Sequence, residues 1–318
     1  MEEHPRSAEM NRSVKNAHSP ADSQVLSVLH QEASSLKDAE SYCKRLAKTH
    51  YENFIVASVF LPSYLRQHYY NIYAYCRISD DLGDETSSPT LSLELLKQWE
   101  EELQSCFEGH PHHPIFIALR ETIERFQIPI TPFANLLEAF KRDQIKNRYA
   151  TYDELLDYCR YSANPVGHLV LYLMGYRDAE RRAISDKTCT ALQLTNHWQD
   201  IGRDLVRLNR IYIPLEDMHH FGYTEADLAA QTCNESFVEL MRLEIDRARS
   251  LFQEGQKLRD CVSPSHAMDI ELFSRCGLEI LRQIELAHYD VFRRRPTLTK
   301  WNSLRILAQS WCSTQLRK

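Results

Sequence analysis

Residues 193–204 read QLTNHWQDIGRD, and the spacing of the polar residues in this stretch decides how we expect the chain to fold. Asn196, Asp200 and Asp204 follow one another at intervals of four residues, and Gln193 precedes them on the same side. In an α-helix, residues at this spacing stack along one face over successive turns. The stretch therefore predicts a helix with a stripe of oxygen donors, which are the ligands that Mg²⁺ prefers.

A second acidic pattern lies upstream, where residues 80–84 read DDLGD. Asp80 and Asp84 share one helical face, and Arg77 lies one turn before them. Acidic pairs at this spacing are also common on solvated helix faces, and like charges there destabilise a helix unless a cation lies between them. Two such stripes on separate helices, facing each other, would hold magnesium ions and a diphosphate between them.

The composition favours helices throughout. The 318 residues include only 8 glycines and 12 prolines, which are too few for the many turns of a sheet-rich protein. No alternating strand pattern longer than four residues and no glycine-rich nucleotide motif is present. We expect an all-α fold, a single large helical bundle with a central cavity, over residues 25–318, and a disordered tail over residues 1–24. Asn164-Pro165 should break a helix, because proline lacks a backbone donor and clashes with the preceding turn. The longest helices are expected over residues 178–208, 237–258 and 267–292, and a last one over residues 298–316.

The net charge and the cysteine content limit the cellular environment and the binding partners that we expect for this protein. The formal net charge of −6 argues against nucleic acid as a partner, because phosphate neutralisation needs a basic surface. The nine cysteines include no C-x-x-C pair, so we expect reduced thiols in a cytoplasmic protein without a signal peptide. No apolar run is long enough to span a bilayer. The basic residues 293–295 allow peripheral contact with the inner face of a membrane, although cations at a helix end are also typical of a solvated surface.

The motifs together resemble those of the squalene and phytoene synthases, the head-to-head isoprenoid synthases of the all-α terpenoid fold. The resemblance covers about residues 40–310. Its carriers are Tyr-x-x-x-Arg followed by DDLGD (residues 73–84), NHWQDIGRD (residues 196–204) and NRIYIP (residues 209–214).

This resemblance implies roles for individual residues. It implies magnesium as the cofactor, held by Asp80, Asp84, Asn196, Asp200 and Asp204. It implies diphosphate contacts from His50, Tyr73, Arg77, Gln193, Arg210 and Tyr212. The sequence YDVFRR near the C-terminus places Tyr289 and Arg294 in positions that resemble further phosphate-facing residues.

Departures from the usual family pattern resemble the hydroxysqualene synthase branch of bacterial hopanoid supply. Gln199 stands where the family has arginine, Arg203 stands where it has an acidic residue, and Asn164-Pro165 replaces a Val-Ala-Gly-type sequence. His50 is followed by a segment that contains Asn53 where most of the family is serine-rich. The branch implies ionisation of presqualene diphosphate and capture of the cation by water, with no hydride donor. Neighbouring enzymes of the same pathway are the protein partners it suggests. The residues considered for steering the water are Asn53, Asn164 and His197.

Three alternatives stay open at this stage. The first is a condensing squalene or phytoene synthase that uses two allylic diphosphates such as farnesyl diphosphate and shares every metal ligand. The second is a di-iron carboxylate bundle, for which Glu216-x-x-His219 and Glu285-x-x-His288 supply the required pattern. The third is a non-catalytic scaffold protein of the same fold, which has no need of five metal-type ligands.

Overall fold

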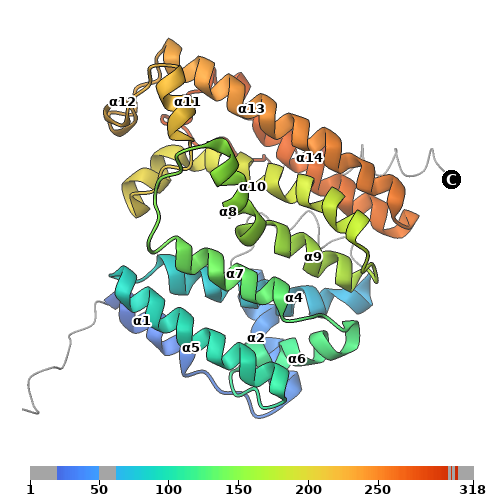
Figure 1. The fold of residues 1–318 in the computed structure, drawn as a ribbon. Coiled ribbons are helices and arrows are strands. Elements are labelled where there is room, and N and C mark those ends of the chain that lie inside the picture. The colour runs from blue at the N-terminus through green and yellow to red at the C-terminus, as the bar shows by residue number, and fades with distance from the viewer. Residues whose placement is uncertain (1–19, 50–61, 300–301, 303–304, 307–318) are drawn as a thin grey trace, which may run out of the picture.

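The computed structural model of the chain describes residues 20–49, 62–299, 302 and 305–306 (Figure 1). Within these ranges the protein is built from helices, and the β-type pairing consists of one isolated bridge between Arg148 and Ile211. The expected all-α fold is confirmed. The helices in chain order are α1 Pro20–Leu29, α2 Leu36–Thr49, α4 Ser63–Asp84, α5 Pro89–Glu108, α6 Pro114–Phe126, α7 Thr131–Arg142, α8 Tyr152–Ser162, α9 Asn164–Leu173, α10 Ala179–Leu208, α11 Leu215–His220, α12 Glu225–Ala229, α13 Glu235–Gly255, the 3₁₀-helix η1 Gln256–Cys261 and α14 Pro264–Leu286.

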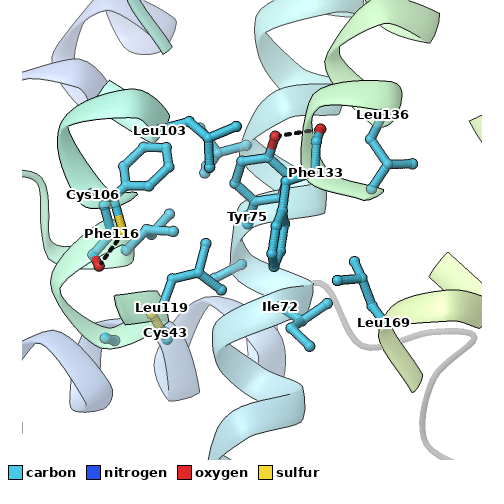
Figure 2. Close-up of a cluster of buried hydrophobic side chains, with 14 of the residues drawn as sticks. Cys43, Ile72, Tyr75, Leu103, Cys106, Phe116, Leu119, Phe133, Leu136 and Leu169 are labelled. Carbon is cyan, nitrogen blue, oxygen red and sulfur yellow. Dashed lines mark hydrogen bonds between the residues drawn. The ribbon is translucent and has the colours of Figure 1, made fainter. Parts of the chain in front are cut away.

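Two large apolar clusters divide the bundle. The first joins α2, α4, α5, α6 and α7, in the lower half of Figure 1, and Tyr75 lies at its centre (Figure 2). The Tyr75 hydroxyl donates a hydrogen bond of 2.8 Å to the carbonyl of Phe133, so a polar group is buried there without being left unpaired. The second cluster joins α8, α10 and α13 in the upper half. The walls of the candidate site come from both halves.

Local sequence signals explain several boundaries. Asp178 caps α10, because its side chain accepts a hydrogen bond of 2.9 Å from the backbone N–H of Arg181. Ala163 separates α8 from α9, and Pro165 lies in the first turn of α9, as expected for a proline-induced break.

Other boundaries differ from expectation. Helix α1 begins at Pro20, inside the segment predicted to be a tail, while residues 1–19 lie outside the described residues. Helix α14 ends at Leu286 and not at residue 292, because His288 and Tyr289 adopt left-handed backbone conformations with φ of 53° and 63°. The helix predicted over residues 298–316 lies mostly outside the described residues.

Two glycines let α10, α13 and α14 approach one another closely. A Cβ atom on Gly255 of α13 would lie 2.1 Å from the Thr188 hydroxyl of α10. A Cβ atom on Gly277 of α14 would lie 2.2 Å from the ring of Phe252 on α13. Side chains at these positions would force the helices apart, so the glycines fix the spacing of one wall of the site.

The cysteines and the helix lengths bear on the environment of the protein. The eight cysteines in the described ranges are free thiols, and three of them, Cys43, Cys106 and Cys159, are buried. Across the described residues, every helix is either too short or too polar to cross a bilayer.

Candidate active site

The first aspartate-rich stripe lies on the C-terminal half of α4. Arg77 forms an ion pair with Asp81, one turn further along the helix, and its Nη1 lies 3.4 Å from Oδ2 of Asp80. Burial of the region, followed by the charge of neighbouring Asp84, raises the pKa of Asp80. Since 44% of the Asp80 side chain remains accessible, this carboxylate lies at the mouth of the site. The guanidinium of Arg77 therefore lies among the acidic side chains of its own helix, as the helix spacing predicted.

The second stripe lies on α10, as the interval of four residues predicted. The side-chain amide of Asn196 donates a hydrogen bond of 3.2 Å to Oδ2 of Asp200. Asp200 is 5% exposed and is held by both arms of the Arg295 guanidinium, with Nη2 at 2.8 Å from Oδ2. Paired hydrogen bonds of this kind are the strongest that an arginine makes with a carboxylate. The structure thus assigns Asp200 a partner from the segment that follows α14.

Arg210 brings the two stripes together. It follows α10 in the chain, is 6% exposed, and places its Nη1 2.8 Å from Oδ1 of Asp84 on α4. Burial raises the pKa of Asp204 to about 7, and the charges of Asp200 and then Asp84 contribute in the same direction. The aspartates of α4 and α10 are therefore close enough to repel one another.

A network of buried polar side chains packs around Arg210. Arg210 also lies 3.9 Å from Asp143, and the hydroxyl of Tyr158 donates a hydrogen bond of 2.7 Å to the same carboxylate. Tyr212 stacks on His197 with ring centroids 3.6 Å apart. Burial lowers the pKa of His197 to about 3, so this imidazole stays neutral. His197 lies in this packed layer and contacts Gln193 of the cavity rim, with the two side-chain nitrogens 3.3 Å apart, and a role in steering the water stays a prediction.

A cavity of about 370 Å³ opens beside the second stripe. Its polar end carries Gln193, Asn196 and Gln199 of α10. Beyond them the lining becomes apolar and comes from α8, α9, α10 and α14, including Ala163, Val166, Leu192, Leu272, Phe273 and Ile280. A polar rim above an apolar pocket suits a ligand with a charged head and a hydrocarbon tail.

The segment after α14 closes one side of this cavity. The side-chain amide of Gln199 donates a hydrogen bond to the carbonyl of Pro296, and Leu298 lines the cavity. Arg305 anchors the same segment through an ion pair of 2.6 Å with Glu279 of α14. Gln199, which the sequence singled out as a departure from the family, therefore holds the chain that carries Arg295.

The donor set fits magnesium. All candidate ligands are oxygen atoms; burial and, after it, the charges of neighbouring aspartates raise the pKa values of Asp80 and Asp204, and a divalent cation would offset both effects. No three histidine, cysteine or acidic side chains of the described ranges converge tightly enough to form a ready-made metal site. Instead, Asp84 forms an ion pair with Arg210, and Asp200 forms one with Arg295.

The remaining predicted residues fall into three groups. Tyr73 lies on α4 one turn before Arg77, and Gln193 lies at the cavity with its amide 3.3 Å from the ring of His197. Tyr289 lies in the turn after α14, where Arg242 stacks over its ring, and Arg294 is exposed. His50 and Asn53 lie outside the described residues.

Two further residues bear on the earlier hypotheses. Asn164 accepts a hydrogen bond of 3.0 Å from Thr190 and ties α9 to α10. The di-iron pattern is not assembled, because no three such side chains converge in the described ranges; Glu285 pairs with Arg249, and Glu216 accepts a hydrogen bond from the backbone of Tyr152. The site residues that the sequence did not predict are Asp143, Tyr158 and Arg295, the last of which was considered only for membrane contact.

Comparison with known proteins agrees with this geometry. Two facing aspartate-rich helices above an apolar cavity in an all-α bundle define an isoprenoid synthase that acts on diphosphates. The family model for squalene/phytoene synthase matches residues 47–302. The chain therefore belongs to the squalene/phytoene synthase family.

Individual relatives refine this assignment. A phytoene synthase from Arthrospira platensis is 33% identical over 85% of this chain and 91% of its own length. The crystal structure of squalene synthase HpnC from Alicyclobacillus acidocaldarius superposes with a TM-score of 0.76 and 46% identity, over 80% of this chain and 95% of that one. A dehydrosqualene synthase in complex with a ligand superposes with a TM-score of 0.81 at 26% identity, over 88% of this chain and 98% of that one.

Proposed function

We propose that the protein converts presqualene diphosphate to hydroxysqualene and diphosphate, with magnesium as its cofactor. The observation that carries this proposal is Gln199, which replaces a phosphate-facing arginine and is engaged by the Pro296 carbonyl. A condensing enzyme must neutralise two diphosphates, whereas an enzyme that starts from presqualene diphosphate neutralises one. The 46% identity to the squalene synthase HpnC, against 33% to the phytoene synthase, favours a squalene-type enzyme over a phytoene-type one.

We assign binding of the metal and diphosphate to the polar end of the cavity and binding of the hydrocarbon to its apolar walls. Asp80, Asp84, Asn196, Asp200 and Asp204 would hold the metal, which supplies positive charge to the departing diphosphate. Arg77 and Arg210 add guanidinium groups at the same place, where developing negative charge needs stabilisation. The apolar walls exclude bulk water from the hydrocarbon.

The proposed reaction breaks one C–O bond of the substrate and forms another with water. The C–O bond of presqualene diphosphate breaks, and its electron pair leaves with the diphosphate. The cyclopropylcarbinyl cation rearranges, and its ring opens to an allylic cation. One water molecule forms the new C–O bond and releases a proton. No electron donor is consumed.

An extraction assay with purified protein and magnesium, without nicotinamide, tests this proposal. One reaction receives presqualene diphosphate and the other farnesyl diphosphate. We expect hydroxysqualene from the first reaction only. Presqualene diphosphate or a hydrocarbon formed from an allylic diphosphate would instead establish a condensing synthase, the second candidate, which the names of the phytoene synthase relatives favour. No product from either substrate would favour the scaffold hypothesis.

A further inference from the structure

A second, smaller cavity of about 80 Å³ adjoins the cavity of the candidate active site. Four half-buried side chains line both cavities, namely Val166, Cys189, Leu192 and Phe273. The two cavities are therefore neighbouring chambers, and these four side chains form the boundary between them. We call the cavity of about 370 Å³ beside Asn196 the outer chamber and the smaller cavity the inner chamber.

Three helices arrange the two chambers in the same order. Along α10, which both α9 and α14 contact (Figure 1), the lining passes from Asn196 in the outer chamber to Ser185 in the inner one. On α14 it passes from Ile280 to Ile270, and on α9 the residues of the inner chamber likewise follow those of the outer chamber. The chambers therefore follow α10 away from the aspartate-rich end of the site, towards the N-terminus of that helix.

The inner chamber ends at a packed apolar cluster. Leu171 of α9, Leu258 of η1 and Ile270 of α14 line the chamber, and each is 5% exposed or less. Together with Met174 they form a buried cluster of their own. These side chains close the far end of the chamber and leave it no opening on that side.

Two hydroxyl groups beside the inner chamber lie against neighbouring helices. A Cβ atom on Gly167 of α9 would lie 2.5 Å from the hydroxyl of Ser185, and one on Gly255 of α13 would lie 2.1 Å from that of Thr188. Both hydroxyls are therefore packed against helix backbone, and the surface that faces the chamber is mainly apolar. An apolar space of this kind offers water too few hydrogen bonds, so a hydrocarbon is the ligand that suits it.

The depth of the chambers can be compared with the length of an isoprenoid tail. Eleven residues separate Asn196 from Ser185, which corresponds to about 16 Å along α10. An extended main chain of twelve carbons, as in a farnesyl group, spans roughly 14 Å, and one of sixteen carbons, as in a geranylgeranyl group, spans roughly 19 Å. A tail whose diphosphate lies at the predicted metal ligands therefore ends in the inner chamber when it has farnesyl length.

We propose that the inner chamber receives the last isoprene unit of a substrate tail and that Leu258 and Ile270, which close it, limit the tail to farnesyl length. The inference rests on the proposed function and deepens it by assigning residues that determine specificity. A tail one unit shorter leaves the chamber empty and loses the burial of its last unit. A tail one unit longer has to displace side chains of a packed cluster, which is unfavourable.

Binding of non-ionisable thiolodiphosphate analogues tests this assignment without requiring turnover. Titration calorimetry in the presence of magnesium would compare the geranyl, farnesyl and geranylgeranyl analogues. We expect the wild-type enzyme to bind the farnesyl analogue at least tenfold more tightly than either of the other two.

A variant that fills the inner chamber tests its role directly. Val170 of α9 is half-buried and lines the inner chamber alone, so Val170→Phe places a ring in that space. The ratio of the farnesyl to the geranyl affinity should fall at least tenfold, while the geranyl affinity stays within threefold of the wild-type value. The matched control is Val206→Phe, the same substitution at a residue of α10 that is 73% exposed, and it should change neither affinity.

Variants that open the far end test the limit on length. Leu258→Ala and Ile270→Ala each leave a space behind the inner chamber, because surrounding side chains refill such a space only in part. Each should shift the ratio of the farnesyl to the geranylgeranyl affinity at least fivefold towards the longer analogue. Leu95→Ala makes the same kind of space at a residue of α5 that is 1% exposed, and it should leave this ratio unchanged. If one of these variants fails to fold, the others test the chamber.

Each outcome bears on the proposal. A folded Val170→Phe variant with the wild-type ratio of farnesyl to geranyl affinity would overturn it, as would a wild-type enzyme that binds the farnesyl and geranylgeranyl analogues equally. Unchanged ratios in both Leu258→Ala and Ile270→Ala would overturn the assignment of these two residues. Failure of the wild-type enzyme to bind any analogue would overturn both the chamber and the proposed function. The expected ratios, in an enzyme that forms a product other than hydroxysqualene, would refute the proposed reaction and leave the role of the chamber in place.

Discussion

On α4 the carboxylates of Asp80 and Asp81 are held by Arg77 of the same helix, whereas on α10 the carboxylate of Asp200 is held by Arg295, 95 residues further along the chain. Asp80 and Asp81 are therefore paired within their own helix, although Asp84 pairs with Arg210 from beyond α10, whereas Asp200 depends on the chain that follows α14. The difference also extends to exposure, because the Asp80 side chain is 44% accessible and that of Asp200 is 6% accessible. The first helix forms a locally determined wall of the site, and the second a wall completed by tertiary structure.

The largest expected effects come from removing one predicted metal ligand from each wall. Asp80→Asn and Asp200→Asn keep the side-chain shape and lose the charge, so each should lower kcat by about 10²- to 10³-fold. Steady-state assays at saturating magnesium measure this effect, with Asp246→Asn, which removes a carboxylate that is 63% exposed on α13, as the control. Wild-type turnover in either variant would contradict the assignment of a metal ligand to both walls, because only the other wall would then support catalysis.

The next effect concerns stability without metal. Arg295→Ala leaves the buried Asp200 carboxylate without its cation and should lower the free energy of unfolding by about 2 kcal/mol. Arg77→Ala should cost about 1 kcal/mol or less, because Asp80 and Asp81 remain partly solvated. Urea unfolding in the presence of a chelator measures both losses. Equal losses in the two variants would contradict the proposed difference between the walls.

Asp269 of α14 sharpens the comparison, because this carboxylate is 2% exposed and no hydrogen-bond partner or paired cation is found for it among the described residues. Its pKa is about 7 in the folded protein and near 3.8 when unfolded, so between these values the folded state holds one more proton. Stability from this group is therefore highest below pH 4 and falls as the pH rises to about 7, by about 1 kcal/mol per pH unit. The measurement is the free energy of unfolding at pH 5, 6 and 7.

The control for this experiment is Asp269→Asn, which cannot ionise. Its stability should fall less steeply between pH 5 and 7 than that of the wild-type protein. Parallel pH profiles in the two proteins would show that Asp269 has an ordinary pKa and is solvated.

The smallest effect concerns the link between Gln199 and Pro296. Gln199→Leu removes the hydrogen bond and should cost about 1 kcal/mol or less, while trypsin cleaves after Arg293 and Arg294 a few times faster. Gln199→Arg restores a cation and retains hydrogen-bond donors, so it should not by itself abolish turnover of presqualene diphosphate. Limited proteolysis and the extraction assay measure these two effects.

An unchanged cleavage rate in Gln199→Leu would show that the other contacts of the segment are sufficient to hold it. Loss of turnover in Gln199→Arg would show that position 199 has another role in the reaction, such as positioning the water.

The sequence predicted the parts of the site that depend on helix spacing. The stripes of Asp80 and Asp84, and of Asn196, Asp200 and Asp204, follow from intervals of four residues, and Arg77 lies close enough in sequence to be assigned to them. The break at Asn164-Pro165 also follows from local chemistry. The assignment of these residues to a metal remains a prediction.

The parts that were missed depend on contacts between distant segments. Asp143 and Tyr158 meet only because α7 and α8 pack together, and no local pattern marks either residue. The sequence drew attention to Arg294, whereas its neighbour Arg295 points at Asp200, because the two left-handed residues that end α14 redirect the chain. Such a turn cannot be read from helical periodicity, which predicted that the helix would continue to residue 292.

The position of Arg295 in the chain has a consequence for biosynthesis. During translation, α4, α7 and α10 are complete long before residue 295 is made, so the emerging protein presents the carboxylate of Asp200 without its guanidinium partner. Any association of the two aspartate-rich helices before that point takes place while their repulsion is only partly balanced. The charge balance of the site is therefore completed near the end of synthesis, and a ribosome that stops short of residue 295 leaves a bundle that lacks the ion pair on its second wall.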